Sequence, residues 1–263
     1  MDGSQYMDKV NKIVDTDKNK MLTIAIMNSK GGSGKTTIAT NLASYYAAQD
    51  LKTVMVDQDV QGSSVQWLKR RSEKSPIINT TVVFDQPTNY TRSWLARVPT
   101  GTQRVLIDTP AGIEVQQIEN VAKRADIIIV PVLLSPIDSE AVGIFLRRLK
   151  NILSKKHEMT HLAVVANRVG QKTRSYKILE TCLLNMKVPF IATLRDSQNY
   201  IQASEQGIGV HELKNRKITH DLLQWQPLLD WIELKESSSA RYLETNMSSK
   251  IHSASGVCQT SVS

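Results

Sequence analysis

The stretch Asn28-Ser29-Lys30-Gly31-Gly32-Ser33-Gly34-Lys35-Thr36-Thr37 decides the fold of this 263-residue chain. It follows an apolar, β-branched run from Leu22 to Met27 and precedes a helical pattern of apolar residues from Ile38 to Ala47. A strand, a glycine-rich turn and a helix, in that order, are the setting of a phosphate-binding loop. The glycines let backbone N–H groups converge on an anion, and the helix N-terminus adds its own unpaired N–H groups. The sequence therefore predicts a phosphate site, with Lys35 on the phosphates and the Thr36 hydroxyl on Mg²⁺.

Apolar runs alternate with helical patterns along the rest of the chain, which predicts an α/β fold. Further strands are expected at Thr53–Asp57, Ile77–Phe84, Arg104–Asp108, Asp126–Leu134, His161–Arg168 and Val188–Ala192. Helices are expected from the loop to Gln49, at Ser64–Arg71, Glu114–Arg124, Thr173–Met186 and Asp221–Lys235, and from an Asp138 N-cap to Leu153. Continuous apolar strands joined by helices favour a mostly parallel central sheet with helices on both faces. Ile77–Phe84 is expected at an edge, and Pro227 is expected to kink the last helix or mark its start.

The chain length and the composition of its ends predict one domain with two short extensions. Residues 21–235 should form the α/β domain, residues 1–20 a flexible lead, and residues 236–263 a disordered polar tail rich in Ser and Thr. The apolar runs are too short for a membrane span, and the lead does not resemble a signal peptide. Two cysteines, Cys182 and Cys258, do not suggest a metal site or a structural disulfide. A cytoplasmic protein is expected.

The net charge of +8 lies on the body of the chain. The charges within residues 1–20 cancel, as do those within 236–263, so the excess falls on 21–235. A basic body with neutral ends favours a polyanion partner, most simply nucleic acid, although solubility alone is an equally good reason for such a charge.

Three carboxylates stand where predicted strands end. Asp57 ends the second strand and Asp59 follows it, while Asp108 is the acid at the end of the strand that begins at Arg104. In an open α/β sheet, residues at the carboxyl ends of the strands lie beside the phosphate loop. These acids are therefore candidates for the metal and for the attacking water.

The loop does not meet the strict phosphate-loop pattern, because Ser29 stands where its first glycine belongs. Lys-Gly-Gly-Ser-Gly-Lys-Thr-Thr, from Lys30 to Thr37, instead resembles the deviant Walker A motif of the ParA/MinD family of P-loop ATPases. Asp57-Gln58-Asp59-Val60-Gln61 resembles the family's D-x-D-P-Q element, with Val60 in place of Pro. The Asp108-Thr109-Pro110-Ala111-Gly112 segment resembles its Walker B strand and following turn. The resemblance spans about residues 22–235 and implies a P-loop NTPase fold.

The resemblance implies a role for each site residue. The ligands would be ATP and Mg²⁺, held by Lys30, Gly31, Gly32, Ser33, Gly34, Lys35, Thr36 and Thr37. Asp59 would position the water, Asp57 would support the Mg²⁺ region, and Asp108 would hold Mg²⁺ through water. Asn167, at the end of a later strand, would contact the adenine. Lys30 would reach across an ATP-bound homodimer to the phosphates of the second subunit.

The resemblance also implies a biological role. Family members of the ParA type bind DNA without sequence preference as ATP dimers, and a ParB-like or other cargo-adaptor protein stimulates hydrolysis. Such a protein would be nucleoid-associated and would partition or position a plasmid, a chromosome or a protein assembly. Late basic residues would contact DNA: Lys214, Arg216 and Lys217, and less favoured Arg195, which could lie near the nucleotide instead.

Other members of this class remain as alternatives. A MinD-like membrane-positioning ATPase would need a basic amphipathic C-terminal helix, whereas Ser248–Ser263 is Ser-rich with scattered apolar residues, so stable membrane association is not expected. A reductase of the nitrogenase iron-protein type would need more cysteine ligands than two. A metabolic P-loop ATPase is compatible with the fold, because fold does not fix function.

Overall fold

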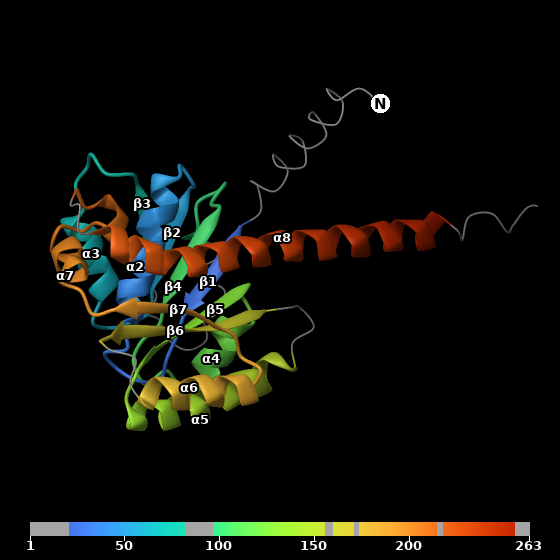
Figure 1. Ribbon diagram of the computed structural model, residues 1–263. Helices are drawn as coiled ribbons and strands as arrows, with labels where there is room; N and C mark the ends of the chain where they lie inside the picture. The colour runs from blue at the N-terminus through green and yellow to red at the C-terminus, as the bar shows by residue number, and fades with distance from the viewer. Residues whose placement is uncertain (1–20, 83–96, 156–159, 171–173, 215–217, 256–263) are drawn as a thin grey trace, which may run out of the picture.

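The computed structural model of the protein describes residues 21–82, 97–155, 160–170, 174–214 and 218–255. Its centre is a seven-stranded sheet in the order β3-β2-β4-β1-β5-β6-β7, with every pairing parallel (Figure 1). The strands are β1 (Leu22–Ile26), β2 (Thr53–Asp57), β3 (Ile78–Val82), β4 (Arg104–Asp108), β5 (Ile127–Leu133), β6 (His161–Val169) and β7 (Phe190–Arg195). The α/β fold with a parallel sheet is confirmed.

Helices cover both faces of the sheet, as predicted. One layer contains α2 (Lys35–Ala48), α3 (Ser63–Arg70), α7 (Gln198–Glu205), the short 3₁₀ helix η2 (Val210–Glu212) and α8 (Thr219–Ser255). The other contains α4 (Val115–Ala122), α5 (Pro136–Leu153) and α6 (Arg174–Asn185), below the sheet in Figure 1. The side chains of β1 alternate between the layers: Ile24 and Ile26 pack under α2, while Ala25 faces the other core. The central strand β1 is therefore apolar on both sides.

The register of the parallel strands brings the predicted site to one edge of the sheet. Asp108 at the end of β4 is paired with Asp57 of β2 on one side and with Ile26 of β1 on the other. The phosphate loop leaves β1 directly after Ile26, and Asn167 lies near the end of β6. The polar residues at or after the ends of β1, β2, β4 and β6 therefore lie at the same edge of the sheet.

Two boundaries differ from the prediction because of proline. The strand β7 begins at Phe190 rather than at Val188, since Pro189 has no N–H and the Val188 N–H closes α6 by bonding to the Leu183 carbonyl. The helix α5 begins at Pro136, so Asp138 lies within its first turn and is not its N-cap. Proline is well tolerated there, because the first N–H groups of a helix need no intrahelical partner. The predicted edge strand is β3, and residues 83 and 84 lie outside the described residues.

The helix α8 also differs from the prediction. It begins at Thr219, continues through Pro227 and ends at Ser255, past the point at Glu236 where the sequence predicted a disordered tail. Buried residues on both sides of the proline, Trp225, Leu228 and Ile232, hold the helix against the sheet and offset the missing hydrogen bond. Once these turns are fixed, adding further residues costs little, and the last turns project beyond the sheet in Figure 1.

Candidate nucleotide-binding site

The phosphate loop connects β1 to α2 and is held by its own polar groups. Gly34, with φ of 94°, is the N-cap of α2, and Gly32 also has a positive φ of 73°. The Lys30 carbonyl accepts hydrogen bonds from the Ser33 hydroxyl at 3.3 Å and the Lys35 ammonium at 3.2 Å. Asn28 fastens the loop to β5 by donating to the Pro131 carbonyl at 2.7 Å. The turn is therefore preformed around the start of a helix, which suits an anion.

The predicted phosphate contacts occupy distinct positions on this turn. Gly31 and Gly32 are exposed at its tip, Ser33 and Lys35 are buried, and Thr36 and Thr37 are partly exposed in the first turn of α2. Burial lowers the pKa of Lys35, and the negative charges of Asp108 and Asp59 act against this shift. The ammonium group is thus a desolvated cation at the point where phosphate oxygens would lie.

Asp108 is a buried carboxylate without a hydrogen-bond partner. Only 1% of the residue is exposed, and neither side-chain oxygen has a partner among the described residues. Burial, helped by repulsion from Asp57, raises its pKa to about 7, while the Thr36 hydroxyl and the Lys35 ammonium act in the opposite sense. A buried acid that lacks donors fits a cation, because carboxylate oxygens are hard ligands suited to Mg²⁺. Thr36 and Asp108 are the residues that would hold this ion.

Asp57 is occupied by the loop that follows it. Its Oδ1 accepts from the Asp59 N–H at 2.9 Å, and its Oδ2 accepts from the Ser64 hydroxyl at 2.6 Å and the Val65 N–H at 3.1 Å. The carboxylate thus fixes the start of α3 and the position of Asp59, and its support of the Mg²⁺ region stays a prediction. Asp59 is partly exposed, with Oδ1 accepting from the Gln61 N–H at 3.0 Å.

Asn167 lies directly against the phosphate loop. It is 4% exposed, and its amide donates to the Ser33 carbonyl at 3.0 Å. A Cβ on Gly34 would lie 1.9 Å from its Nδ2 atom, so only glycine fits beside it. Asn167 therefore supports the loop from β6, and its contact with adenine stays a prediction.

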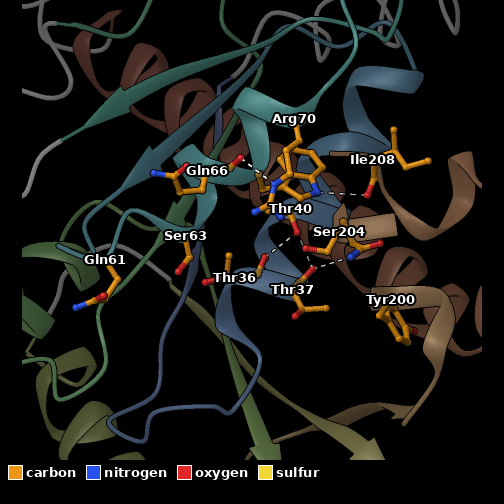
Figure 2. A pocket seen from close by; sticks show the side chains of 12 residues that line it. Thr36, Thr37, Thr40, Gln61, Ser63, Gln66, Arg70, Tyr200, Ser204 and Ile208 are labelled. Atoms are coloured by element: carbon orange, nitrogen blue, oxygen red, sulfur yellow. Dashed lines mark hydrogen bonds between the residues drawn. The ribbon is translucent and has the colours of Figure 1, made fainter. Parts of the chain in front are cut away.

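A cavity of about 430 Å³ opens beside the first turns of α2 (Figure 2). Its walls come from three helices, with Thr37 from α2, Gln66 from α3, and Tyr200 and Ser204 from α7. Of these lining residues, Gln66, Tyr200 and Ser204 are not predictable from the sequence. No local pattern marks them, because they meet only after the chain has folded.

The predicted DNA-contact residues Arg195 and Lys214 have different surroundings in the structure. Arg195 forms an ion pair with buried Asp221, at 2.5 Å from Nε to Oδ1, and Asp221 also accepts from Ser197 and Asn199. Arg195 therefore fastens β7 to α8, which is evidence against a free phosphate contact. Lys214 is exposed, directly after buried Leu213. Arg216 and Lys217 lie outside the described residues.

The family of the chain follows from comparison with known proteins. The model of the CobQ/CobB/MinD/ParA nucleotide binding domain matches residues 24–210, and the chain belongs to this family. The predicted ParA/MinD resemblance is confirmed. A curated relative, maintenance of carboxysome distribution protein A (McdA) of Halothiobacillus neapolitanus, is 26% identical over 199 residues, which cover 75% of this chain and 90% of the relative.

Solved structures agree at the level of the fold. The ATP complex of a point variant of Cyanothece McdA superposes with a TM-score of 0.63 at 17% identity, over 80% of this chain and 97% of that one. A putative plasmid partition protein of Borrelia burgdorferi bound to AMPPNP gives a TM-score of 0.63 at 16% identity, over 80% of this chain and 99% of that one. Within the part of the chain that the structure describes, no helix is both long and apolar enough to cross a membrane.

Proposed function

We propose that the protein is a Mg²⁺-dependent ATPase of the ParA type that positions or partitions a cargo. The observation that carries this proposal is the meeting of a desolvated Lys35 with the partnerless carboxylate of Asp108 at a preformed phosphate loop. A cation and a metal-seeking acid at one helix N-terminus are what a metal–nucleotide complex needs. The McdA and plasmid-partition relatives, whose solved structures contain ATP or AMPPNP, support the same ligand.

Each residue of the site has a separate role in ATP hydrolysis. The Lys30–Thr37 loop would bind the phosphates, and Thr36 and Asp108 would hold Mg²⁺. When bound, the ion would supply charge neutralisation at the phosphate oxygens. Asp59 orients the attacking water from a loop that Asp57 holds in place. Lys30 of a second subunit would add positive charge as water attacks the γ-phosphate and the bond between the β- and γ-phosphates breaks, with ADP as the leaving group. An inserted cation of this kind raises phosphoryl-transfer rates by about 10³–10⁵.

Binding of ATP drives dimerisation, and the dimer binds DNA without sequence preference. The +8 net charge on the body of the chain supports this step, with Lys214, Arg216 and Lys217 as the favoured contacts. Two copies of a weak basic patch bind duplex DNA more tightly than one, which links DNA affinity to ATP through avidity. An adaptor protein on the cargo then stimulates hydrolysis and releases the dimer. The cargo would be a plasmid, a chromosome or a protein assembly, and the name of the McdA relative supports a protein assembly such as the carboxysome.

Retention on random-sequence duplex DNA tests the proposal. The protein should bind with ATP, bind little with ADP, and lose affinity with salt by a log–log slope of roughly −0.9 per phosphate contact. Changing Lys214, Arg216 and Lys217 together to Glu should remove retention and leave ATP-driven dimerisation intact. Changing the exposed Lys69, Lys74 and Lys187 to Glu is the matched control for net charge. If the wild type shows no ATP-dependent retention at low salt, the DNA-binding function is wrong, and flotation with anionic liposomes then tests a membrane role.

A further inference from the structure

The residue that follows α3 is bound tightly to a segment more than a hundred residues later in the chain. Arg71 donates two hydrogen bonds to the Glu212 carboxylate, at 2.9 and 2.8 Å, and a third to the Gly207 carbonyl at 3.1 Å. The side chains are only 6% and 15% exposed. Burial alone would raise the pKa of Glu212, but hydrogen bonds from Arg71 and Ser44 hold this pKa below its usual range. The pair therefore stays ionised and locks the end of α3 to this segment.

The same segment, Gly207–Leu213, is bound to α2. The Asn41 side chain accepts from the Val210 N–H at 2.7 Å and donates to the Thr37 carbonyl at 2.8 Å. The Ser44 hydroxyl accepts from the Gly209 N–H at 3.0 Å and donates to Glu212. Asn41 thus spans from the first turn of the phosphate-loop helix to this segment. We name Gly207–Leu213 the coupling segment.

The coupling segment packs so closely on α2 and on the end of α3 that a side chain larger than glycine does not fit at two of its positions. A Cβ on Gly207 would lie 2.4 Å from the Arg71 backbone nitrogen, and Gly207 has a φ of +65°. A Cβ on Gly209 would lie 2.7 Å from the Ser44 hydroxyl. The backbone therefore packs directly on α2 and on the end of α3. The Trp67 indole adds a hydrogen bond by donating to the Ile208 carbonyl at 3.4 Å.

The helices α2 and α3 begin at the edge of the sheet that carries the predicted nucleotide site, and a basic residue directly follows the coupling segment. Lys35 and Thr36 open α2, and the Asp57 carboxylate joins the start of α3 to the loop that carries Asp59. A displacement of that loop toward a bound phosphate must therefore move α3 and Arg71 with it. At the other end, exposed Lys214 follows Leu213 directly.

From these contacts we propose that the coupling segment transmits the nucleotide state from the phosphate loop to exposed Lys214, the residue that directly follows the segment. Arg71 and Glu212 are its positioning residues, since they touch neither nucleotide nor DNA. This inference rests on the proposed function, because it supplies the route by which ATP controls DNA affinity. In this route, ATP would raise the DNA affinity of each subunit through a conformational change, in addition to the avidity that dimerisation provides.

Hydrogen exchange of the wild-type protein tests the coupling segment without DNA. Backbone amides from Ile208 to Leu213 should exchange at least threefold more slowly with a non-hydrolysable ATP analogue than with ADP. In Arg71→Lys, which keeps the charge but loses the bidentate geometry, this difference should disappear while the affinity for both nucleotides stays within twofold. A merely structural pair would raise exchange equally in both states. Lys69→Ala, an exposed basic residue of the same helix, is the matched control and should behave as wild type.

The outcomes separate this inference from the proposed function. Identical exchange with both nucleotides in the wild type, or an unchanged nucleotide difference in a folded Arg71→Lys protein, would overturn the coupling role. Ser44→Ala removes two contacts without leaving a buried charge, so it replaces Arg71→Lys if that variant does not fold. Where DNA binds, the ratio of DNA dissociation constants with ADP and ATP analogue should fall at least threefold in the variants. A wild type that shows the exchange difference but no DNA retention contradicts the DNA-binding function and leaves the segment's response to nucleotide established.

Discussion

Replacing Asp108 by Asn should change the pH dependence of stability in a defined direction. The folded-state pKa of Asp108 is raised to about 7, whereas the ordinary value of 3.8 applies to the unfolded chain. Between these values the folded state holds a proton that the unfolded state has released. The free energy of unfolding therefore falls as pH rises from about 4 to about 7, and this loss is absent below 4.

The magnitude follows from the size of the shift. Each unit is worth about 1.36 kcal/mol, so a shift of about three units lowers the free energy of unfolding by about 4 kcal/mol at pH 7 and above. Asn carries no charge at any pH and lacks this component. The stability of Asp108→Asn relative to wild type should therefore increase by about 4 kcal/mol between pH 4 and pH 8.

Urea unfolding of the metal-free and nucleotide-free protein, from pH 4 to pH 8, measures this difference. Thr109→Val is the matched control, because Thr109 is buried beside Asp108 and its hydroxyl donates to the Ile26 carbonyl at 3.0 Å. Losing that bond should lower stability by a constant amount at every pH. Parallel curves for wild type and Asp108→Asn would refute the reasoning. Saturating Mg²⁺ and ATP should also stabilise the wild type more than Asp108→Asn, since the bound metal offsets the buried charge.

Three further predictions concern the phosphate loop, the dimer and the contact between β7 and α8. Gly34→Ala should cost about 1–2 kcal/mol for its left-handed backbone alone and should weaken ATP binding in a calorimetric titration, because its Cβ collides with Asn167; unchanged affinity would contradict the loop geometry. Lys30→Ala mixed with Asp59→Ala should regain partial ATP turnover, since the Asp59→Ala subunit supplies Lys30 to the intact site; no rescue in verified mixed dimers argues against action in trans. Arg195→Ala should lower the melting temperature, because it leaves the buried Asp221 carboxylate without its cation, whereas a change confined to DNA affinity would favour the original DNA-contact assignment.

The phosphate loop and the elements beside it could be predicted because the residues that specify them are close together in the sequence. A β-branched run, glycines at the turn and a lysine at the helix start lie within sixteen residues of one another, so Leu22–Thr37 indicates strand, loop and helix directly. The alternation of apolar runs with helical patterns likewise predicts the parallel sheet. Parallel topology then fixes the edge at which Asp57, Asp108 and Asn167 gather, because the carboxyl ends of parallel strands coincide. Prediction was weakest at the ends of elements, where Pro136 and Pro189 moved two boundaries.

Only the tertiary structure shows which polar side chains already have hydrogen-bond or ion-pair partners within the protein. The sequence gives Arg195 and Asp57 the same character as Lys214 and Asp108, yet Asp221 holds Arg195 and three donors hold Asp57. Arg71 and Glu212 stand 141 residues apart, and nothing in either neighbourhood indicates that they meet. Side-chain pairing depends on how separate helices pack over the sheet, which no spacing along the chain encodes. The sequence by itself determined the phosphate loop and the sheet, while the fold determined the partners of each charge, and with them the connection from that loop to Lys214.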